Sequence, residues 1–359
     1  MARHYTELSK NEEDRARQVH ERSYVINGLT GFGGEIAAGI EFYNIMKQGG
    51  LTAVNYTVGS GEFSEPCRTI ANMFRAFNIV GRDKFFSATS AEDIRKAKKA
   101  GAAAMIFGFQ NTLPILQDVG WLEFFRKLGV MIIQLTYQKM NLVGCGCGEI
   151  VSSGKDCGLS AFGVQVVEEM NRLGILIDLS HVGHQTTMDA MELSKDPVAF
   201  THTNVRALHD FCRCKTDEEI KALAEKDGVM GIVALSKFVR PRDPQGYFVP
   251  ATMDNYLEHV DYSVKLVGAD YVGIGTDIDE FRTTEEYEQG KLNVQGTLNT
   301  ELRSQKDAFI REKYYVDGLP SIAKSLNVTR GLVSRGYSDQ EIEKILGGNF
   351  LRLFGRVWK

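Results

Sequence analysis

The chain has 359 residues, of which 43% are hydrophobic and 25% are charged, and its net charge is −4. This composition is that of a globular protein, and the small negative charge argues against binding to nucleic acid or to an anionic membrane. No apolar run approaches the roughly 20 residues that are needed to cross a bilayer. The N-terminal stretch lacks the apolar core of a secretory signal, and six cysteines in so long a chain do not indicate a disulfide framework. We therefore expect a reduced, cytoplasmic protein.

Eight short segments rich in apolar and β-branched residues recur along the chain, and they predict eight strands. The segments are 24–28, 51–58, 103–109, 130–137, 175–181, 198–203, 229–235 and 271–277. Their hydrophobicity is nearly continuous rather than alternating, which is typical of parallel strands that are covered on both faces.

Helical patterns lie between these strands, for example at 122–129, 162–174, 216–228 and 253–268. The sequence "TDEE" at 216–219 has the form of a capping box, and glycine follows several of the helices. Strand and helix alternate eight times, which predicts one domain over the whole chain, a (β/α)₈ TIM barrel. An open doubly wound sheet is the alternative, but no GxGxxG follows the first strand.

Two segments lie outside this pattern. Residues 1–22 are charged and predict an N-terminal helical extension. Residues 279–320 are polar and irregular, and they directly follow the eighth strand. A loop of this length in a compact protein is usually functional, so we expect the 279–320 insertion to act at the catalytic end or at an interface.

Functional side chains of such barrels lie where the strands end. The residues at the predicted ends are Leu29, Gly31, Gln110, Tyr137, His181, His202 and Asp277. His181 and His202 end adjacent strands, and two neighbouring imidazoles are typical of one half of a metal site. A single histidine in this position is more often a structural residue. Three other histidines, His4, His20 and His259, fall in predicted helices, where we expect them at the surface.

The segments "EMNRLGILIDLSHVG", "PVAFTHTNVRAL", "YVGIGTDID" and "ILGGNFLRLF" resemble the membrane (renal) dipeptidase family of the amidohydrolase superfamily. The resemblance runs in order from about residue 24 to the C-terminus. It implies a (β/α)₈ barrel with two zinc ions that hydrolyses dipeptides, and a homodimer. It also implies that His181 and His202 bind one zinc ion, that Asp277 binds the other and accepts a proton, and that Arg213 binds the substrate carboxylate.

Four residues depart from the family pattern. The His-x-Asp pair of the first strand is replaced by Leu29 and Gly31, and the bridging glutamate falls at Gln110. The histidine that polarises the scissile carbonyl falls at Tyr137. A neutral amide does not offset the repulsion between two cations. We therefore predict a divergent subfamily that binds at most one divalent ion, zinc being the expected metal.

The predicted ion is held by His181 and His202, and Asp277 or the amide oxygen of Gln110 supplies a third ligand. Asp277 moves the proton, and Arg213 and Tyr137 complete the predicted catalytic set. Arg213, Asn204, Tyr137 and Gln110 are the predicted substrate-binding residues.

The predicted reaction is hydrolysis of a small amide or peptide-like substrate that carries a carboxylate, with weak or absent dipeptidase activity. Two alternatives remain open: a lyase, isomerase or decarboxylase on the same barrel, or a non-catalytic protein that binds a small molecule.

Two Cys-x-Cys pairs, Cys145 with Cys147 and Cys212 with Cys214, follow the fourth and sixth predicted strands. Four thiols on two catalytic-face loops are compatible with a metal site, and Arg213 between two cysteines would lower a thiol pKa and favour a nucleophile. However, Cys-x-Cys is not the usual zinc spacing, and a buried cysteine is commonly a small apolar residue.

Overall fold

The computed structural model of the chain describes residues 4–31, 36–241, 243–244, 249–281, 283, 285 and 310–359. Most of the predicted 279–320 insertion, and Phe32 to Glu35 of the first loop, lie outside these residues. No helix within the described ranges combines the length and the apolar character that crossing a bilayer requires.

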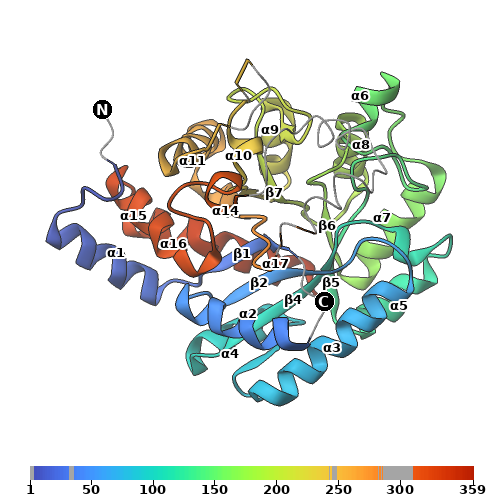
Figure 1. Ribbon diagram of the computed structural model, residues 1–359. Coiled ribbons are helices and arrows are strands. Elements are labelled where there is room, and N and C mark those ends of the chain that lie inside the picture. Colours follow the sequence, from blue (N-terminus) through green and yellow to red (C-terminus); the bar gives the residue numbers. More distant parts are fainter. Residues whose placement is uncertain are drawn as a thin grey trace.

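Eight parallel strands form a closed barrel, as the sequence predicts (Figure 1). They are β1 (Ile26–Thr30), β2 (Ala53–Gly59), β4 (Ala103–Phe109), β5 (Val130–Gln134), β6 (Leu176–Asp178), β7 (Ala199–Val205), β9 (Val229–Ile232) and β10 (Val272–Ile274). Each strand pairs with its neighbour in parallel, and the ring closes where β10 pairs with β1.

Two short strands escape the sequence prediction. β3 (Phe85–Ser87) pairs with the start of β4, and β8 (Cys214–Lys215) pairs with the end of β7. Segments of three and two residues are too short to show a periodic pattern.

The strands expected at 175–181 and 271–277 are shorter than predicted. β6 ends at Asp178, whose Oδ1 accepts a hydrogen bond of 3.0 Å from the backbone N–H of Ser180 and so turns the chain. After β10, Asp277 has a φ of +57°, a left-handed conformation that a strand cannot contain.

The seam between β1 and β10 is pinned by side chains. Asn27 Nδ2 donates to Thr276 Oγ1 at 2.8 Å, and the backbone N–H of Thr276 donates to Asn27 Oδ1 at 2.9 Å. Thr30 Oγ1 donates to the carbonyl of Ile278 at 2.6 Å. The first and last barrel strands are thus joined by polar side chains in addition to their backbone pairing.

Helices surround the barrel (Figure 1). They are α1 (Lys10–Arg22), α2 (Ile36–Gln48), α3 (Ser64–Val80), α4 (Ala91–Ala100), α5 (Gly120–Lys127), α6 (Glu149–Ser153), α7 (Ala161–Leu173), α8 (His184–Leu193), α9 (Asp217–Glu225), α10 (Ser236–Val239), α11 (Met253–Val267), α14 (Arg311–Tyr314), α15 (Leu326–Ser334), α16 (Asp339–Glu343) and α17 (Asn349–Val357). The predicted capping box is present at α9, where Thr216 and Glu219 bond reciprocally. α1 packs beside α15, so the N-terminal helix lies against a helix from the last part of the sequence (Figure 1).

The amino-terminal end of the barrel is closed by α17. Asn349 Nδ2 donates to the carbonyl of Val272 at 2.8 Å, where β10 begins. The ring of Phe350 lies so close to the barrel that a Cβ at Gly28 or at Gly273 would be 2.7 Å from it. The fully buried Phe350 therefore fills the bottom of the barrel, and only the carboxyl ends of the strands are left for a site.

Candidate active site at the carboxyl ends of the strands

His181 and His202 meet at the carboxyl ends of β6 and β7. Their Nε2 atoms are 2.9 Å apart, and both side chains are buried. Burial holds the pKa of each imidazole well below its usual value, and the charge of Arg213 lowers both further. Both rings are therefore neutral near pH 7, which is the form that binds a metal ion.

A turn at the end of β6 and a buried carboxylate place the two histidines. Asp178 Oδ1 accepts hydrogen bonds from the hydroxyl of Ser180 at 2.5 Å and from the backbone N–H of Thr201 at 3.0 Å. Its Oδ2 accepts from the hydroxyl of Thr201 at 2.6 Å, and Thr201 Oγ1 lies 2.8 Å from Nδ1 of His202. Burial raises the pKa of Asp178, whereas these hydrogen bonds act in the opposite direction.

β7 bends inward at Thr201, and a glycine on β9 and a glycine just after β10 make room for it. The pairing of β7 with β9 shifts register between Phe200 and Thr203. A Cβ at Gly231 would lie 2.2 Å from the carbonyl oxygen of Thr201, and a Cβ at Gly275 would lie 1.9 Å from it. Any side chain at either position would push β7, and with it His202, out of place.

Two buried cations support the histidines from β8. Arg213 Nη1 donates to the carbonyl of Ser180 at 2.6 Å, and its Nη2 donates to the carbonyl of His202 at 3.0 Å. Lys215 Nζ donates to the carbonyl of Val182 at 2.9 Å and to Glu219 Oε1 at 3.1 Å. The backbone on both sides of the histidine pair is therefore held by charged donors.

Arg213 is only 1% exposed, and its guanidinium lies 5.3 Å from the centre of the Phe238 ring. Both terminal nitrogens are engaged with backbone carbonyls, while Nε has no partner among the residues that the structure describes. The side chain therefore acts on the protein itself, and the N–H groups that these two bonds leave unused, Nε–H among them, are the donors left for a substrate carboxylate.

The remaining predicted site residues occupy different surroundings. The ring of Tyr137 stacks on His181 with centroids 4.2 Å apart, and Tyr137 is 38% exposed. Asn204 is tied to β9, since its Oδ1 accepts from the backbone N–H of Val233 at 3.2 Å. Asp277 is partly exposed beyond β10, and its backbone N–H donates to Leu29 at 3.1 Å.

The predicted site positions in the opposite half of the barrel mouth carry no charged side chain. Gln110 is buried after β4, and its Nε2 donates to Thr57 Oγ1 at 2.8 Å. Leu29 is buried in β1. Gly31 packs so closely that a Cβ there would be 2.8 Å from Cβ of Asp279. None of these three positions has an ionisable side chain, so none of them replaces a charged metal ligand of the family pattern.

As neutral imidazoles, His181 and His202 would supply two ligands to a single ion. Tetrahedral zinc with Zn–N bonds of about 2.0–2.1 Å places its nitrogen ligands about 3.3 Å apart, so the observed pair needs to open by only a few tenths of an ångström. Within the described ranges no group of three or more His, Cys, Asp or Glu side chains is arranged to hold an ion. The residues present therefore fit one ion with two protein ligands and open positions.

The two Cys-x-Cys loops meet beside His181. The backbone N–H of Cys147 donates to the His181 carbonyl at 2.7 Å, and the side chain of Cys212 hydrogen-bonds the Cys147 thiol. Burial alone would raise the pKa of Cys147, but Cys212 and nearby cations such as Arg213 outweigh it and lower the pKa. Burial raises the pKa of Cys214 to about 12, so this thiol stays protonated. All six cysteines are free.

Sequence reasoning missed three kinds of residue. Asp178 and Thr201 were not selected, although a carboxylate that ends an apolar strand was a visible signal. The ion pair between Lys215 and Glu219 also escaped notice. The expectation of surface positions for His20 and His259 is wrong: both are buried, and each donates from Nε2 to a backbone carbonyl at 2.9 Å. In both helices the face that carries the histidine packs against the rest of the protein. These side chains are therefore buried even though they are polar.

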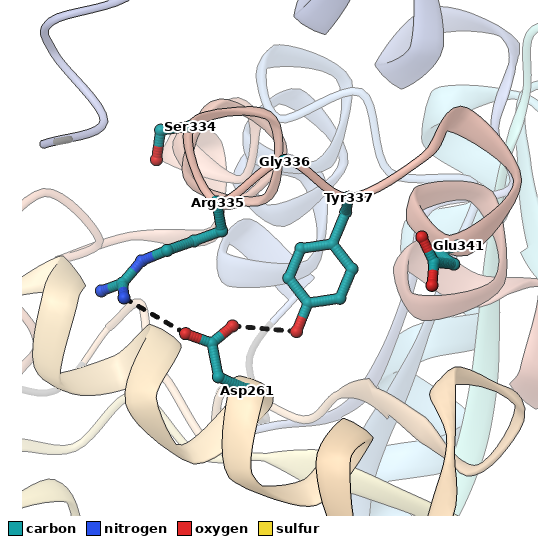
Figure 2. Close-up of a pocket in the computed structure, with 6 residues that line it drawn as sticks. All are labelled: Asp261, Ser334, Arg335, Gly336, Tyr337 and Glu341. Atoms are coloured by element: carbon teal, nitrogen blue, oxygen red, sulfur yellow. Dashed lines mark hydrogen bonds and ion pairs between the residues drawn. The ribbon is translucent and has the colours of Figure 1, made fainter. Parts of the chain in front are cut away.

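A separate pocket of about 470 Å³ lies between α11 and the α15–α16 connection (Figure 2). The Asp261 carboxylate bridges two of its walls: the hydroxyl of Tyr337 donates to it at 2.8 Å, and Arg335 Nη1 lies 3.2 Å from it. These contacts satisfy the charged groups that face one another in Figure 2, and none of the predicted site residues lines this pocket.

Comparisons with known proteins agree with this geometry. The model of the family described as membrane dipeptidase (peptidase family M19) matches residues 68–291. An amidohydrolase from Pseudomonas aeruginosa is 32% identical, and its crystal structure aligns with a TM-score of 0.82 over 96% of this chain and 99% of that chain. The dipeptidase tcpJ of Claviceps purpurea is 26% identical over 327 residues, which are 87% of this chain and 68% of that protein.

A metallopeptidase from Rhodobacter sphaeroides, crystallised with a phosphinate mimic of the dipeptide L-Ala-D-Ala, shares the fold at 17% identity, with a TM-score of 0.75 over 94% of this chain and 99% of that chain. A closed parallel barrel with paired histidines at adjacent strand ends thus defines an amidohydrolase-type enzyme. More narrowly, the chain belongs to the membrane dipeptidase family of metallopeptidases and is a dipeptidase-like hydrolase.

Proposed function

We propose that this enzyme hydrolyses a small amide or peptide-like substrate that carries a carboxylate, and that it uses one divalent ion, zinc, held by His181 and His202. The single observation that carries the proposal is the contrast at the barrel mouth. Two neutral Nε2 atoms face each other at 2.9 Å on one side. Leu29, Gly31 and Gln110 provide no charged ligand on the other side.

When bound, the ion supplies Lewis-acid catalysis for amide hydrolysis. Asp277, which follows β10, accepts the proton in this proposal, because it is the carboxylate that comes just after the last barrel strand. Arg213 fixes the carbonyls of Ser180 and His202 and offers Nε to the substrate carboxylate.

Tyr137 covers one face of His181 and limits the approach of water to that ring. Gln110 and Asn204 lie at the ends of β4 and β7 and complete the proposed substrate-binding set. A homodimer and a cytoplasmic location remain predictions.

Metal stoichiometry tests the number of ions. We expect elemental analysis to give about one zinc per chain for the wild-type protein loaded with zinc, and none for His202→Asn, because a single histidine is too weak a site. His4→Asn is the matched control, since His4 lies outside the barrel and bonds to Thr6 at 2.6 Å. Two zinc ions per wild-type chain would contradict the proposal.

Substrate screening tests the reaction. In a panel of dipeptides, N-acyl amino acids and lactams with added zinc, we expect turnover of a carboxylate-bearing amide that is not a dipeptide. Turnover of any dipeptide near the usual enzyme median of roughly 10 s⁻¹ would show that the departures at Leu29, Gly31 and Gln110 do not matter.

A further inference from the structure

The hydrogen bonds around Asp178 and Thr201 determine where His202 carries its proton. Both oxygens of Asp178 are occupied by donors: Oδ1 receives the backbone N–H groups of Ser180 and Thr201 and the Ser180 hydroxyl, and Oδ2 receives the Thr201 hydroxyl. A backbone N–H can only donate, which fixes Oδ1 as an acceptor, and Oδ2 of the ionised carboxylate accepts the proton of the Thr201 hydroxyl.

The Thr201 hydroxyl has a single proton, and at 2.6 Å that proton is committed to Asp178. Thr201 Oγ1 must therefore accept in its 2.8 Å contact with His202 Nδ1, which places the proton of His202 on Nδ1. Nε2 of His202 then carries a lone pair that points at His181.

The same logic makes the two histidines unequal. In the 2.9 Å contact one Nε2 must donate, and because His202 accepts, the donor is His181. Nδ1 of His181 is buried and has no partner among the described residues, so no acceptor favours a proton there. His202 is ready to bind a cation, whereas His181 must first give up its Nε2 proton.

We propose that Asp178 and Thr201 are positioning residues that fix His202 as the Nδ1–H tautomer, and that His202 is the preformed ligand while His181 binds only after a change of tautomer. The tautomer assignment stands on the hydrogen bonds alone. Its consequence for the ion rests on the proposed function, and it deepens that function by ranking the two ligands.

Two buried histidines provide internal references. Nδ1 of His259 accepts from the backbone N–H of Val205 at 3.1 Å, and its Nε2 donates to the carbonyl of Val239, so His259 is an Nε2–H tautomer. His20 is the same, since its Nε2 donates to the carbonyl of Gly49. In the nitrogen-15 spectrum of metal-free, histidine-labelled protein, we expect His202 to show the opposite pattern of ring shifts from His20 and His259.

Asp178→Asn reverses the chain of hydrogen bonds with little change of shape. Its amide oxygen keeps the Ser180 and Thr201 backbone donors, while its NH₂ donates to Thr201, which turns the Thr201 proton toward His202. We expect His202 to switch to Nε2–H. Thr201→Ser keeps the hydroxyl and should retain the wild-type pattern, and Thr201→Val should lose the preference.

Zinc titration by calorimetry gives a second reading on the same variants. Losing such an outer partner typically weakens metal binding about 10–100-fold, so we expect that loss in Asp178→Asn and Thr201→Val but not in Thr201→Ser. An Nε2–H pattern for His202 in the wild-type protein would overturn the inference without any variant. Wild-type protein with Nδ1–H His202 that binds no zinc would refute the proposed function and leave the tautomer assignment intact.

Discussion

The two halves of the barrel mouth are built from different chemistry. The half formed by β6, β7 and β8 contains a buried carboxylate, Asp178, and two buried cations, Arg213 and Lys215, all bonded to the backbone or hydroxyls around the histidines. The half formed by β1, β2 and β4 contains neutral amides instead. There Asn55 Nδ2 donates to the carbonyl of Gly28 at 2.8 Å, and Gln110 bonds to Thr57.

This difference shows which half of the barrel mouth is built to hold the histidine pair in place. Charged donors beside the histidines fix their backbone, while burial, and after it the charge of Arg213, keeps both rings neutral, the form that binds a metal ion. The amide half is held by single neutral hydrogen bonds, and Asn55 Oδ1 is left without a partner in the described part of the chain. Buried charges thus support the histidine pair in one half of the mouth, and the other half has no such support.

In the half that contains the buried charges, we expect the largest loss of stability when the ion pair between Lys215 and Glu219 is broken. Burial opposes ionisation of Glu219, but Lys215 and further hydrogen bonds hold its pKa at about 2. Glu219→Gln leaves the Lys215 charge buried without its partner, and we expect the free energy of unfolding to fall by about 3–5 kcal/mol at pH 7. Urea denaturation measures this loss.

The pH dependence of that loss has a defined sign. The folded pKa of Glu219 lies below its unfolded value, so the stabilisation is complete above the unfolded value, near pH 4.5, and disappears as the pH falls toward 2. The difference between wild type and Glu219→Gln should shrink over this window. As a control, Glu123→Gln breaks only exposed ion pairs and should change the free energy of unfolding very little. If the two substitutions lowered the free energy of unfolding equally, the buried ion pair would count for no more than an exposed one, and the charged half would have no special stability.

Gly275→Ala tests whether the inward bend of β7 depends on the space that Gly231 and Gly275 leave beside Thr201. The new Cβ would lie 1.9 Å from the Thr201 carbonyl, so we expect a loss of about 1–3 kcal/mol in unfolding free energy and weaker zinc binding. Gly355→Ala is the matched control: its Cβ would meet Ala91 at an ordinary 3.7 Å inside α17, where alanine favours the helix. Wild-type stability and zinc affinity in Gly275→Ala would contradict this reading of β7.

Gln110→Met tests whether the amide of Gln110 is only structural or also serves as a third metal ligand. Methionine keeps the volume and removes the hydrogen bond to Thr57, so we expect a cost of about 1 kcal/mol in stability. Calorimetric titration should give the wild-type zinc affinity. A tenfold or larger loss of affinity would show that the neutral half does contribute a ligand.

The barrel strands could be predicted because each is an uninterrupted apolar run between glycines and caps. The histidine pair could be predicted because both residues follow such runs on consecutive strands. The hydrogen bonds from Asp178 to Thr201 could not, since they depend on how β6 and β7 pair, with Asp178 opposite Ala199.

The environment of Arg213 was equally hidden from the sequence. A charged residue in a polar loop is expected near solvent, yet the two-residue strand β8 carries this segment into the protein. The burial of His259 was easier to predict from the sequence. Tyr256 precedes it by three residues and Val260 follows it by one, and all three lie on the buried face of α11.

The seam between β1 and β10 has a consequence for how the chain folds. Asn27 and Thr276, which bond to each other there, are 249 residues apart in sequence. Bringing such distant segments together carries a large loop-closure entropy, and contacts of this separation slow folding. Strands β4 to β9 pair with near neighbours and can assemble first. We therefore expect closure of the ring to be a late kinetic step, and the intermediate before it to expose two unpaired strand edges, which are sites where partly folded chains associate.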